Sequence, residues 1–137
     1  MTLSALRDDA LRARGDATEI RLSLPWIRSL PVAGLLDPEV VIDGAHHAPT
    51  VALGERRLPA AALVEEDDWW YLQDRVVLEV PDAVTPGIHE VSVSFRLEIP
   101  YLPGGPDQPL RLPFCFTRTL ETGARAKNVS LDVGGAA

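Results

Sequence analysis

The feature that most constrains the fold is a strict alternation of apolar and polar residues within residues 87–99. The two sets are Val91, Val93, Phe95, Leu97 and Ile99 on one side, and Ser92, Ser94, Arg96 and Glu98 on the other. Side chains of a β-strand point alternately to opposite faces, so the alternation predicts one long strand with one buried face. Each buried apolar side chain contributes about 1.5–3 kcal/mol, which requires a second packed layer opposite this face.

Shorter apolar or alternating runs predict further strands. They cover residues 19–24, 40–42, 50–53, 76–80 and 110–120. The Asp43-Gly44 dipeptide is typical of a tight hairpin turn, and we expect it to join the second of these strands to the third. Only residues 81–86 separate the fourth strand from the long one, so these two are expected to pair antiparallel.

The segments between the strands predict turns rather than long helices. The chain has 12 prolines and 10 glycines, and residues 59–64, which begin with a proline, predict one or two helical turns. Its 137 residues match one domain with one core. We therefore predict an all-β fold, a single antiparallel β-sandwich or jelly roll over residues 1–137 with one short helical segment.

The two ends of the chain are less defined by their patterns. Residues 1–17 fit either a short helix or an opening strand that ends at a Gly15-Asp16 turn. Residues 121–137 are mostly small and polar, and we expect a tail or an interface arm.

Composition limits the classes of partner. Thirteen basic and 20 acidic residues give a net charge of −7, which opposes binding to nucleic acid or to anionic lipid. Cys115 is the single cysteine, so no intrachain disulfide is possible. The first 15 residues carry five charges and no apolar run that fits a signal peptide or a membrane span. We expect a cytoplasmic protein with neither a nucleic-acid nor a membrane partner.

No residue set predicts a catalytic or metal centre in this chain. His46 and His47 are adjacent, so on a strand they would face opposite ways, and together with His89 they lack the spacing of a metal-ligand pair. Four consecutive carboxylates at residues 65–68 indicate a solvated connection. Cys115, between two phenylalanines, is expected to behave as a small buried hydrophobe. We predict no catalytic residue and no metal ligand here.

Two apolar features point instead to a binding surface. Residues 69–71 read Trp-Trp-Tyr, and strand alternation puts at least one of these aromatic side chains at the surface. Residues 100–109 are rich in proline and are expected to leave the sheet as a rigid loop that fixes Tyr101 and Leu102. Such loops mark an interface or the wall of a ligand site, although a plain strand connection is the alternative.

Six segments in a fixed order carry a resemblance to a known family. They are LSLPWIRSLP at 22–31, VIDG at 41–44, DWWYLQDR at 68–75, GIHEV at 87–91, IPY at 99–101 and TRTL at 117–120. In order and spacing, the chain from about residue 9 to residue 120 resembles the small β subunit of bacterial C-glycoside deglycosidases.

The resemblance implies a heteromer of one or several αβ units. The β-sandwich subunit pairs with a larger α subunit, a xylose-isomerase-like barrel that holds a divalent metal, usually manganese. The complex cleaves the carbon–carbon bond between a 3-oxo-sugar and an aromatic aglycone such as a flavonoid. The metal and the catalytic base then belong to the partner, and this chain has no cofactor of its own.

Within that scheme we assign two sets of residues. Tyr101, Leu102 and Pro103 are predicted to form part of the wall of a pocket for the 3-oxo-C-glycoside. The predicted subunit interface consists of Trp26, Ile27, Arg28 and Trp70.

A different class of function fits some of the same residues. A stand-alone carbohydrate-binding sandwich would use Trp69 and Trp70 as a stacking platform, and it would be a monomer that binds sugar unaided. An autonomous hydrolase is disfavoured, because the carboxylates cluster in one loop instead of facing one another across a cleft.

Overall fold

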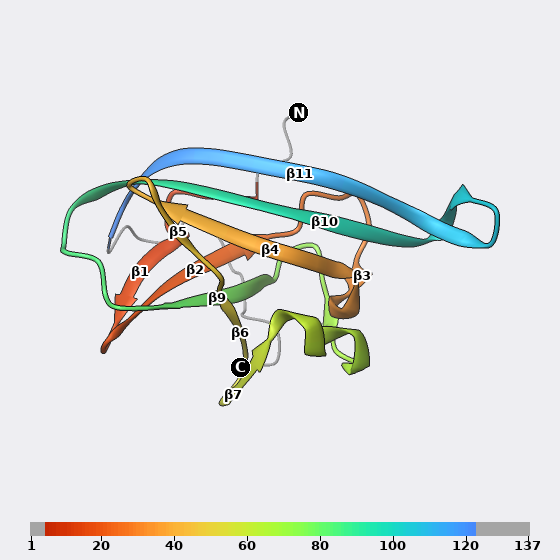
Figure 1. Ribbon diagram of the computed structural model, residues 1–137, viewed down its shortest axis with the longest axis horizontal. Helices are drawn as coiled ribbons and strands as arrows, with labels where there is room; N and C mark the ends of the chain where they lie inside the picture. Colours follow the sequence, from red (N-terminus) through yellow and green to blue (C-terminus); the bar gives the residue numbers. More distant parts are fainter. Residues whose placement is uncertain (1–4, 123–137) are drawn as a thin grey trace.

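The computed structural model of the protein describes residues 5–122, and these form an antiparallel β-sandwich (Figure 1). The five-stranded sheet has the order β1 (Leu11–Arg14), β2 (Ala17–Ser23), β9 (Arg75–Pro81), β6 (Thr50–Leu53), β7 (Arg56–Pro59). The four-stranded sheet has the order β11 (Gln108–Glu121), β10 (Ile88–Gly105), β4 (Leu35–Ile42), β5 (Ala45–His47). A third, small sheet pairs β3 (Leu30–Pro31) with β8 (Trp69–Trp70). The predicted all-β antiparallel class is confirmed.

Helical structure in the described residues is limited to two 3₁₀ segments. The predicted turn at 59–64 is present as η2 (Ala60–Glu65), with Pro59 directly before it, and the sequence reading missed η1 (Val32–Gly34). Within residues 5–122 there is no helix with the length and apolar character that crossing a membrane requires.

The long strand predicted from the alternation is the central strand of the four-stranded sheet. All five of its predicted core residues, Val91, Val93, Phe95, Leu97 and Ile99, are buried. Strands β2 and β9 supply the opposing layer, with buried Ile20, Leu22, Val76, Leu78 and Val80. The second sheet therefore covers the apolar face of β10, as the alternation predicted.

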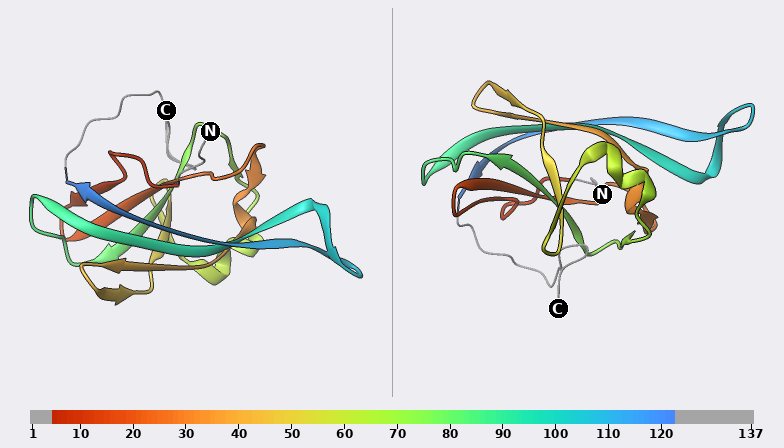
Figure 2. Two further views of the ribbon diagram at one scale, coloured as in Figure 1. Left: turned by 90° about the horizontal axis from the view of Figure 1, so that it is seen from above. Right: turned by 60° about the horizontal axis from the view of Figure 1, so that its bottom comes forward.

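Residues 100–109 do not leave the sheet, contrary to the prediction. β10 and β11 stay paired through Pro103↔Pro109 and Gly105↔Gln108, and this part of the hairpin extends as an arm beyond the rest of the sandwich (Figure 1). Figure 2 shows from two other sides that this arm extends beyond the sandwich. The pairing register shifts twice between Ile99 and Gly105, and such irregularities tolerate prolines, which have no N–H to donate to the ladder.

Two predicted strand pairings are also wrong. β9 pairs with β2 and β6 and lies in the other sheet from β10. Its first four residues are all buried, so both of its faces are covered, unlike the alternating pattern of β10. The Asp43-Gly44 turn forms as predicted, with φ of 48° and 85°, but it pairs Ile42 directly with Ala45. In a hairpin with a two-residue turn, the residue directly after the turn pairs with the residue directly before it. The partner of β4 is therefore β5 and not residues 50–53.

The segment before β1 is held to the sandwich by charge. Arg75, completely buried on β9, donates through Nη1 to Asp9 Oδ1 at 2.6 Å. Burial raises the pKa of Asp9, but the Arg75 bond and the charges of Arg75 and Arg21 outweigh it and hold that pKa below its usual value. Arg118 of β11 donates to the Leu6 carbonyl at 2.8 Å. Of the two alternatives left open for residues 1–17, the described part contains the strand β1; residues 1–4 and all but the start of the predicted tail 121–137 lie outside the described residues.

Removing one partner of the buried ion pair should destabilise the fold strongly. We expect Arg75→Ala to lower the free energy of unfolding by about 3–5 kcal/mol, because it leaves the Asp9 carboxylate buried without its strongest partner. The double variant Arg75→Met, Asp9→Leu should lose clearly less, because it removes both charges. Urea denaturation measures both values. Equal losses for the single and double variants would contradict the ion-pair explanation.

Candidate functional site

Two residue sets that the sequence analysis treated separately meet in the structure. Trp26, from the predicted interface, donates its indole Nε1–H to the Tyr101 hydroxyl at 2.6 Å, and Tyr101 comes from the predicted pocket wall. The Arg28 guanidinium lies over the Tyr101 ring, with Cζ 5.7 Å from the ring centroid. The structure therefore joins residues 26–28 and the base of the arm into one site.

The backbone explains why these side chains meet. Tyr101 lies on β10 two residues beyond Ile99, the last buried residue of that strand, where the arm begins. Residues 24–29 connect β2 to β3, and Trp26 packs its half-buried ring against the core while its N–H reaches the arm. Leu102 also packs against the core, whereas Pro103 is exposed. The half-exposed Tyr101 ring is thus anchored to the body of the sandwich.

A second set of exposed apolar residues lies beside residues 26–31. β3 pairs with β8, and the Leu72 backbone N–H donates to Ser29 Oγ at 3.2 Å, so residues 69–72 lie beside this segment. We define the arm-base surface as the exposed residues that flank the segment or belong to it: Ile27, Arg28, Trp69, Tyr71, Leu72 and Tyr101. It contains Ile27 and Arg28 of the predicted interface and Tyr101 of the predicted pocket wall.

Trp70 is not part of this surface, which corrects its assignment to the interface. Its side chain is completely buried, and its Nε1–H donates to the Asp74 carbonyl at 3.1 Å. Strand alternation turns Trp69 and Tyr71 outward and leaves Trp70 inside, so an aromatic residue does reach the surface as predicted. Trp69 and Trp70 cannot form the stacking platform that a carbohydrate-binding module would need.

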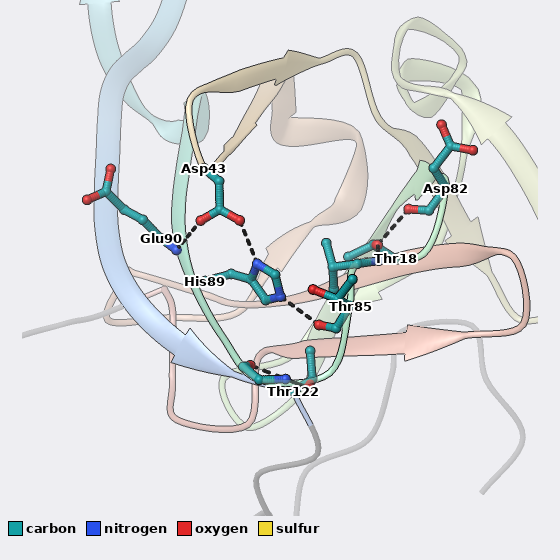
Figure 3. A network of polar contacts seen from close by, with 9 residues as sticks. Thr18, Asp43, Asp82, Thr85, His89, Glu90 and Thr122 are labelled. Atoms are coloured by element: carbon teal, nitrogen blue, oxygen red, sulfur yellow. Dashed lines mark hydrogen bonds and ion pairs between the residues drawn. The ribbon is translucent and has the colours of Figure 1, made fainter.

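The pair most like an acid–base site is His89 with Asp43 (Figure 3). His89 Nδ1 is 2.5 Å from Asp43 Oδ2, and Nε2 is 2.6 Å from the Thr85 carbonyl oxygen. The hydrogen bonds to the Asp43 carboxylate and to the Thr85 carbonyl raise the pKa of His89. The hydrogen bonds that Asp43 makes with His89 and with the Glu90 backbone N–H lower the pKa of Asp43. Both ring nitrogens are engaged within the chain, so this pair holds the β4–β5 turn against β10.

The remaining chemical candidates are separate surface groups. His46 is exposed on β5, and the acidic residues Glu66 and Asp68 both bind Arg56. Cys115 is exposed on the outer face of β11, with Sγ 3.9 Å from Ser92 Oγ, so the prediction of a buried thiol is wrong. The neighbouring phenylalanines take the inward positions. Among residues 5–122, no three His, Cys, Asp or Glu side chains gather as metal ligands would.

Known proteins with similar sequences identify the family. No family model matches the sequence. The chain is 35% identical over 101 residues to the 3'-dehydrocarminate deglycosidase beta subunit of Microbacterium sp, a match covering 69% of this chain and 76% of that relative. It is 30% identical over 122 residues to the C-glycoside deglycosidase beta subunit of Microbacterium trichothecenolyticum, covering 85% and 92% of the two chains. The chain belongs to this family of deglycosidase beta subunits. The resemblance carried by the six sequence segments is confirmed.

The His89 clamp, meaning the hydrogen bonds of His89 to Asp43 and to the Thr85 carbonyl, should make the stability of this beta subunit depend on pH. Because the pKa of His89 is raised on folding, its contribution is complete below the unfolded-state value of about 6.5 and is lost as pH rises through the folded-state value. We expect the urea midpoint of the natural chain to fall as the pH rises above about 6.5, and His89→Gln to flatten this fall. The control His46→Gln, on an exposed histidine, should keep the natural slope. A slope unchanged by His89→Gln would refute the clamp.

Proposed function

We propose that this chain is the accessory β subunit of a heteromeric C-glycoside deglycosidase, a carbon–carbon lyase. Its substrate is a 3-oxo-sugar joined through carbon to an aromatic, flavonoid-type aglycone. The observation that carries the proposal is the similarity, over most of the chain, to two proteins named as deglycosidase beta subunits. The engagement of both His89 ring nitrogens within the fold is consistent with an accessory role.

The proposed partner is a larger barrel subunit, and the complex is proposed to work in the cytoplasm. That subunit would contribute the catalytic base and a divalent metal, with manganese as the proposed ion. The described residues of this chain do not fit a metal site, because no three of their His, Cys, Asp or Glu side chains gather as ligands would. We therefore derive no step for this chain through the metal.

The 3-oxo group explains how such a bond can break without hydrolysis. A ketone at C3 acidifies the C2 proton, so a base can remove it. The C2–H electron pair, held first in the enolate, becomes the C1=C2 bond as the bond from C1 to the aglycone breaks. The aglycone carbon keeps that bonding pair and takes a proton. A sugar with an unoxidised C3 offers no such route, which explains the requirement for the ketone.

In this proposal the beta subunit completes the aglycone side of the pocket. Tyr101 presents a half-exposed ring, and the 2.6 Å bond from Trp26 fixes its orientation. Leu102 and Pro103 follow it along the arm, whose paired backbone limits its movement. A positioned ring that stacks on an aromatic ligand contributes about 0.5–1.5 kcal/mol beyond its buried area. We propose that Tyr101, Leu102 and Pro103 contact the aglycone.

The isolated beta subunit should be inactive. Assayed on a 3-oxo-C-glucoside with manganese present, the purified chain is expected to release no aglycone, because the base and the metal belong to the partner. Combined with the deglycosidase large subunit from the same genome, it should restore turnover. Turnover by the isolated chain near that of the complex would rule out an accessory role, and so would full activity of the large subunit alone.

Tyr101→Ala in the complex should change substrate selectivity more than assembly. The loss of a stacking ring corresponds to a few-fold to about tenfold change in the ratio of kcat/KM for two 3-oxo-glucosides with different aglycones. Tyr71→Ala is the matched control, because this tyrosine has a similar exposed fraction, 51% against 46%, and its ring is not hydrogen-bonded to Trp26. We expect the control to leave the selectivity ratio unchanged. An unchanged ratio for Tyr101→Ala, with a large rise in the subunit dissociation constant, would make Tyr101 an assembly residue only.

A further inference from the structure

We propose that Arg28 receives a carboxylate of the larger subunit within the arm-base surface. The proposal rests on the proposed function, since it names the chemistry by which the two subunits of that complex recognise each other. It makes the arm-base surface, which contains exposed apolar side chains and one cation, the docking face for the larger subunit.

The apolar part of this surface is unusually concentrated. Seven large apolar side chains are exposed in the part of the chain that the structure describes, and five of them belong to the arm-base surface. Their exposed fractions range from 44% for Leu72 to 68% for Ile27; the other two, Val64 and Ile88, lie elsewhere. Apolar patches of this kind, with few charges at the centre, are typical of protein interfaces.

Arg28 is the unusual charge in this surface. Eight arginines of the described chain are ion-paired with a carboxylate: Arg12, Arg21, Arg56, Arg57, Arg75, Arg96, Arg111 and Arg118. Arg28, like Arg7, has no such carboxylate among residues 5–122, and its guanidinium lies over the face of the Tyr101 ring. The acidic run before Trp69 does not supply one, because Glu66 and Asp68 bind Arg56.

The surroundings of Arg28 prepare it for a partner. The Tyr101 ring below it is fixed by the Trp26 N–H, so the guanidinium is positioned before any partner arrives. A planar guanidinium binds a carboxylate through two parallel hydrogen bonds, and such a bond strengthens when apolar neighbours exclude water. The arrangement therefore fits a partner that places one Asp or Glu side chain inside an apolar rim.

The geometry favours the larger subunit over the other occupants. A second copy of this chain, docked symmetrically on the same surface, would bring two Arg28 guanidinium groups together and create repulsion. An open depression of about 380 Å³ lies on the four-stranded sheet around Ser94, Arg96 and Cys115, and it contains no residue of the arm-base surface. A surface with five exposed large apolar side chains suits a protein partner better than a small anion.

The test is the affinity between the natural large subunit and beta-subunit variants. The subunit dissociation constant of the purified complex would be measured at low and high salt for the natural chain, Arg28→Gln, Arg28→Lys and the control Arg57→Gln. Arg57 is an exposed arginine paired with Glu79 at 2.7 Å, away from the arm-base surface. Melting temperatures of the isolated variants report whether they fold.

We expect Arg28→Gln to weaken association by about tenfold to about a hundredfold, because the partner carboxylate would be left buried without its cation. Arg28→Lys should recover part of the affinity, and the salt dependence should be smaller for Arg28→Gln than for the natural chain. Arg57→Gln should associate like the natural chain. An unchanged dissociation constant for folded Arg28→Gln would overturn the proposal.

Other results would point to a different occupant and also overturn it. If Arg28→Gln raises KM only for substrates with an acidic aglycone and leaves association unchanged, the anion belongs to the ligand. If sedimentation shows a dimer of the isolated chain that Arg28→Gln abolishes, the surface joins two copies. Failure of the natural chain itself to bind any deglycosidase large subunit would instead refute the proposed function, so the two failures are distinguishable.

Discussion

The continuous pairing of β10 with β11 is the interaction on which the rest of the structure depends. The ladder runs without interruption from Ile88↔Glu121 to Ile99↔Leu110, and β10 also pairs with β4 on its other side. On the inner face this pairing brings together Phe95, Phe114 and Phe116, with ring centroids 5.7–6.2 Å apart. The hairpin thus provides both the widest wall of the core and the rigid base of the arm.

The arm follows from the same pairing under different local conditions. Beyond Leu102 the residues of the arm up to Pro109 are not part of the core, and prolines and glycines replace the alternation. The tip turns at Pro106 and Asp107, which has φ of 60°, and a Cβ on Gly104 would lie 2.5 Å from the Pro109 carbonyl oxygen. This close approach requires glycine there. The arm is therefore shaped by backbone pairing, and its side chains remain available for a partner.

The sequence predicted the class of fold because a long alternation has one physical meaning. It located the buried face of β10, the Asp43-Gly44 turn and a helical turn after Pro59, since each depends on residues close together in the chain. It misplaced the partners of β4 and β9, because pairing between distant strands is decided by which edges the whole core leaves available. The prolines of residues 100–109 suggested a loop, because proline usually interrupts the hydrogen bonds between strands. The sequence pattern did not show that the irregular β10–β11 pairing accommodates them.

The candidate site was predicted in pieces for the same reason. Trp26, Ile27 and Arg28 were selected as one group and Tyr101 as another, and 75 residues separate the two atoms that the 2.6 Å bond joins. Residues 69–71 are all aromatic, so the sequence does not show which of them point inward, and Trp70 was assigned to the interface. The structure shows that Trp70 points inward and that Trp69 and Tyr71 point outward. Family resemblance supplied the proposed function, while only the folded chain showed that Arg28 has no carboxylate partner among residues 5–122.

The position of Tyr101 gives assembly and substrate binding a common physical element. In the two proposals, one face of its ring carries Arg28 at the subunit contact, and its exposed part meets the aglycone. A ligand that fixes the ring reduces the ordering cost of docking, and docking likewise reduces the ordering cost of ligand binding. Thermodynamic linkage makes the two effects equal, so an aglycone that contacts Tyr101 tightens the subunit contact by the same factor by which the larger subunit tightens aglycone binding. A hydrogen bond from Trp26 that limits the ring's freedom beforehand keeps this coupling small.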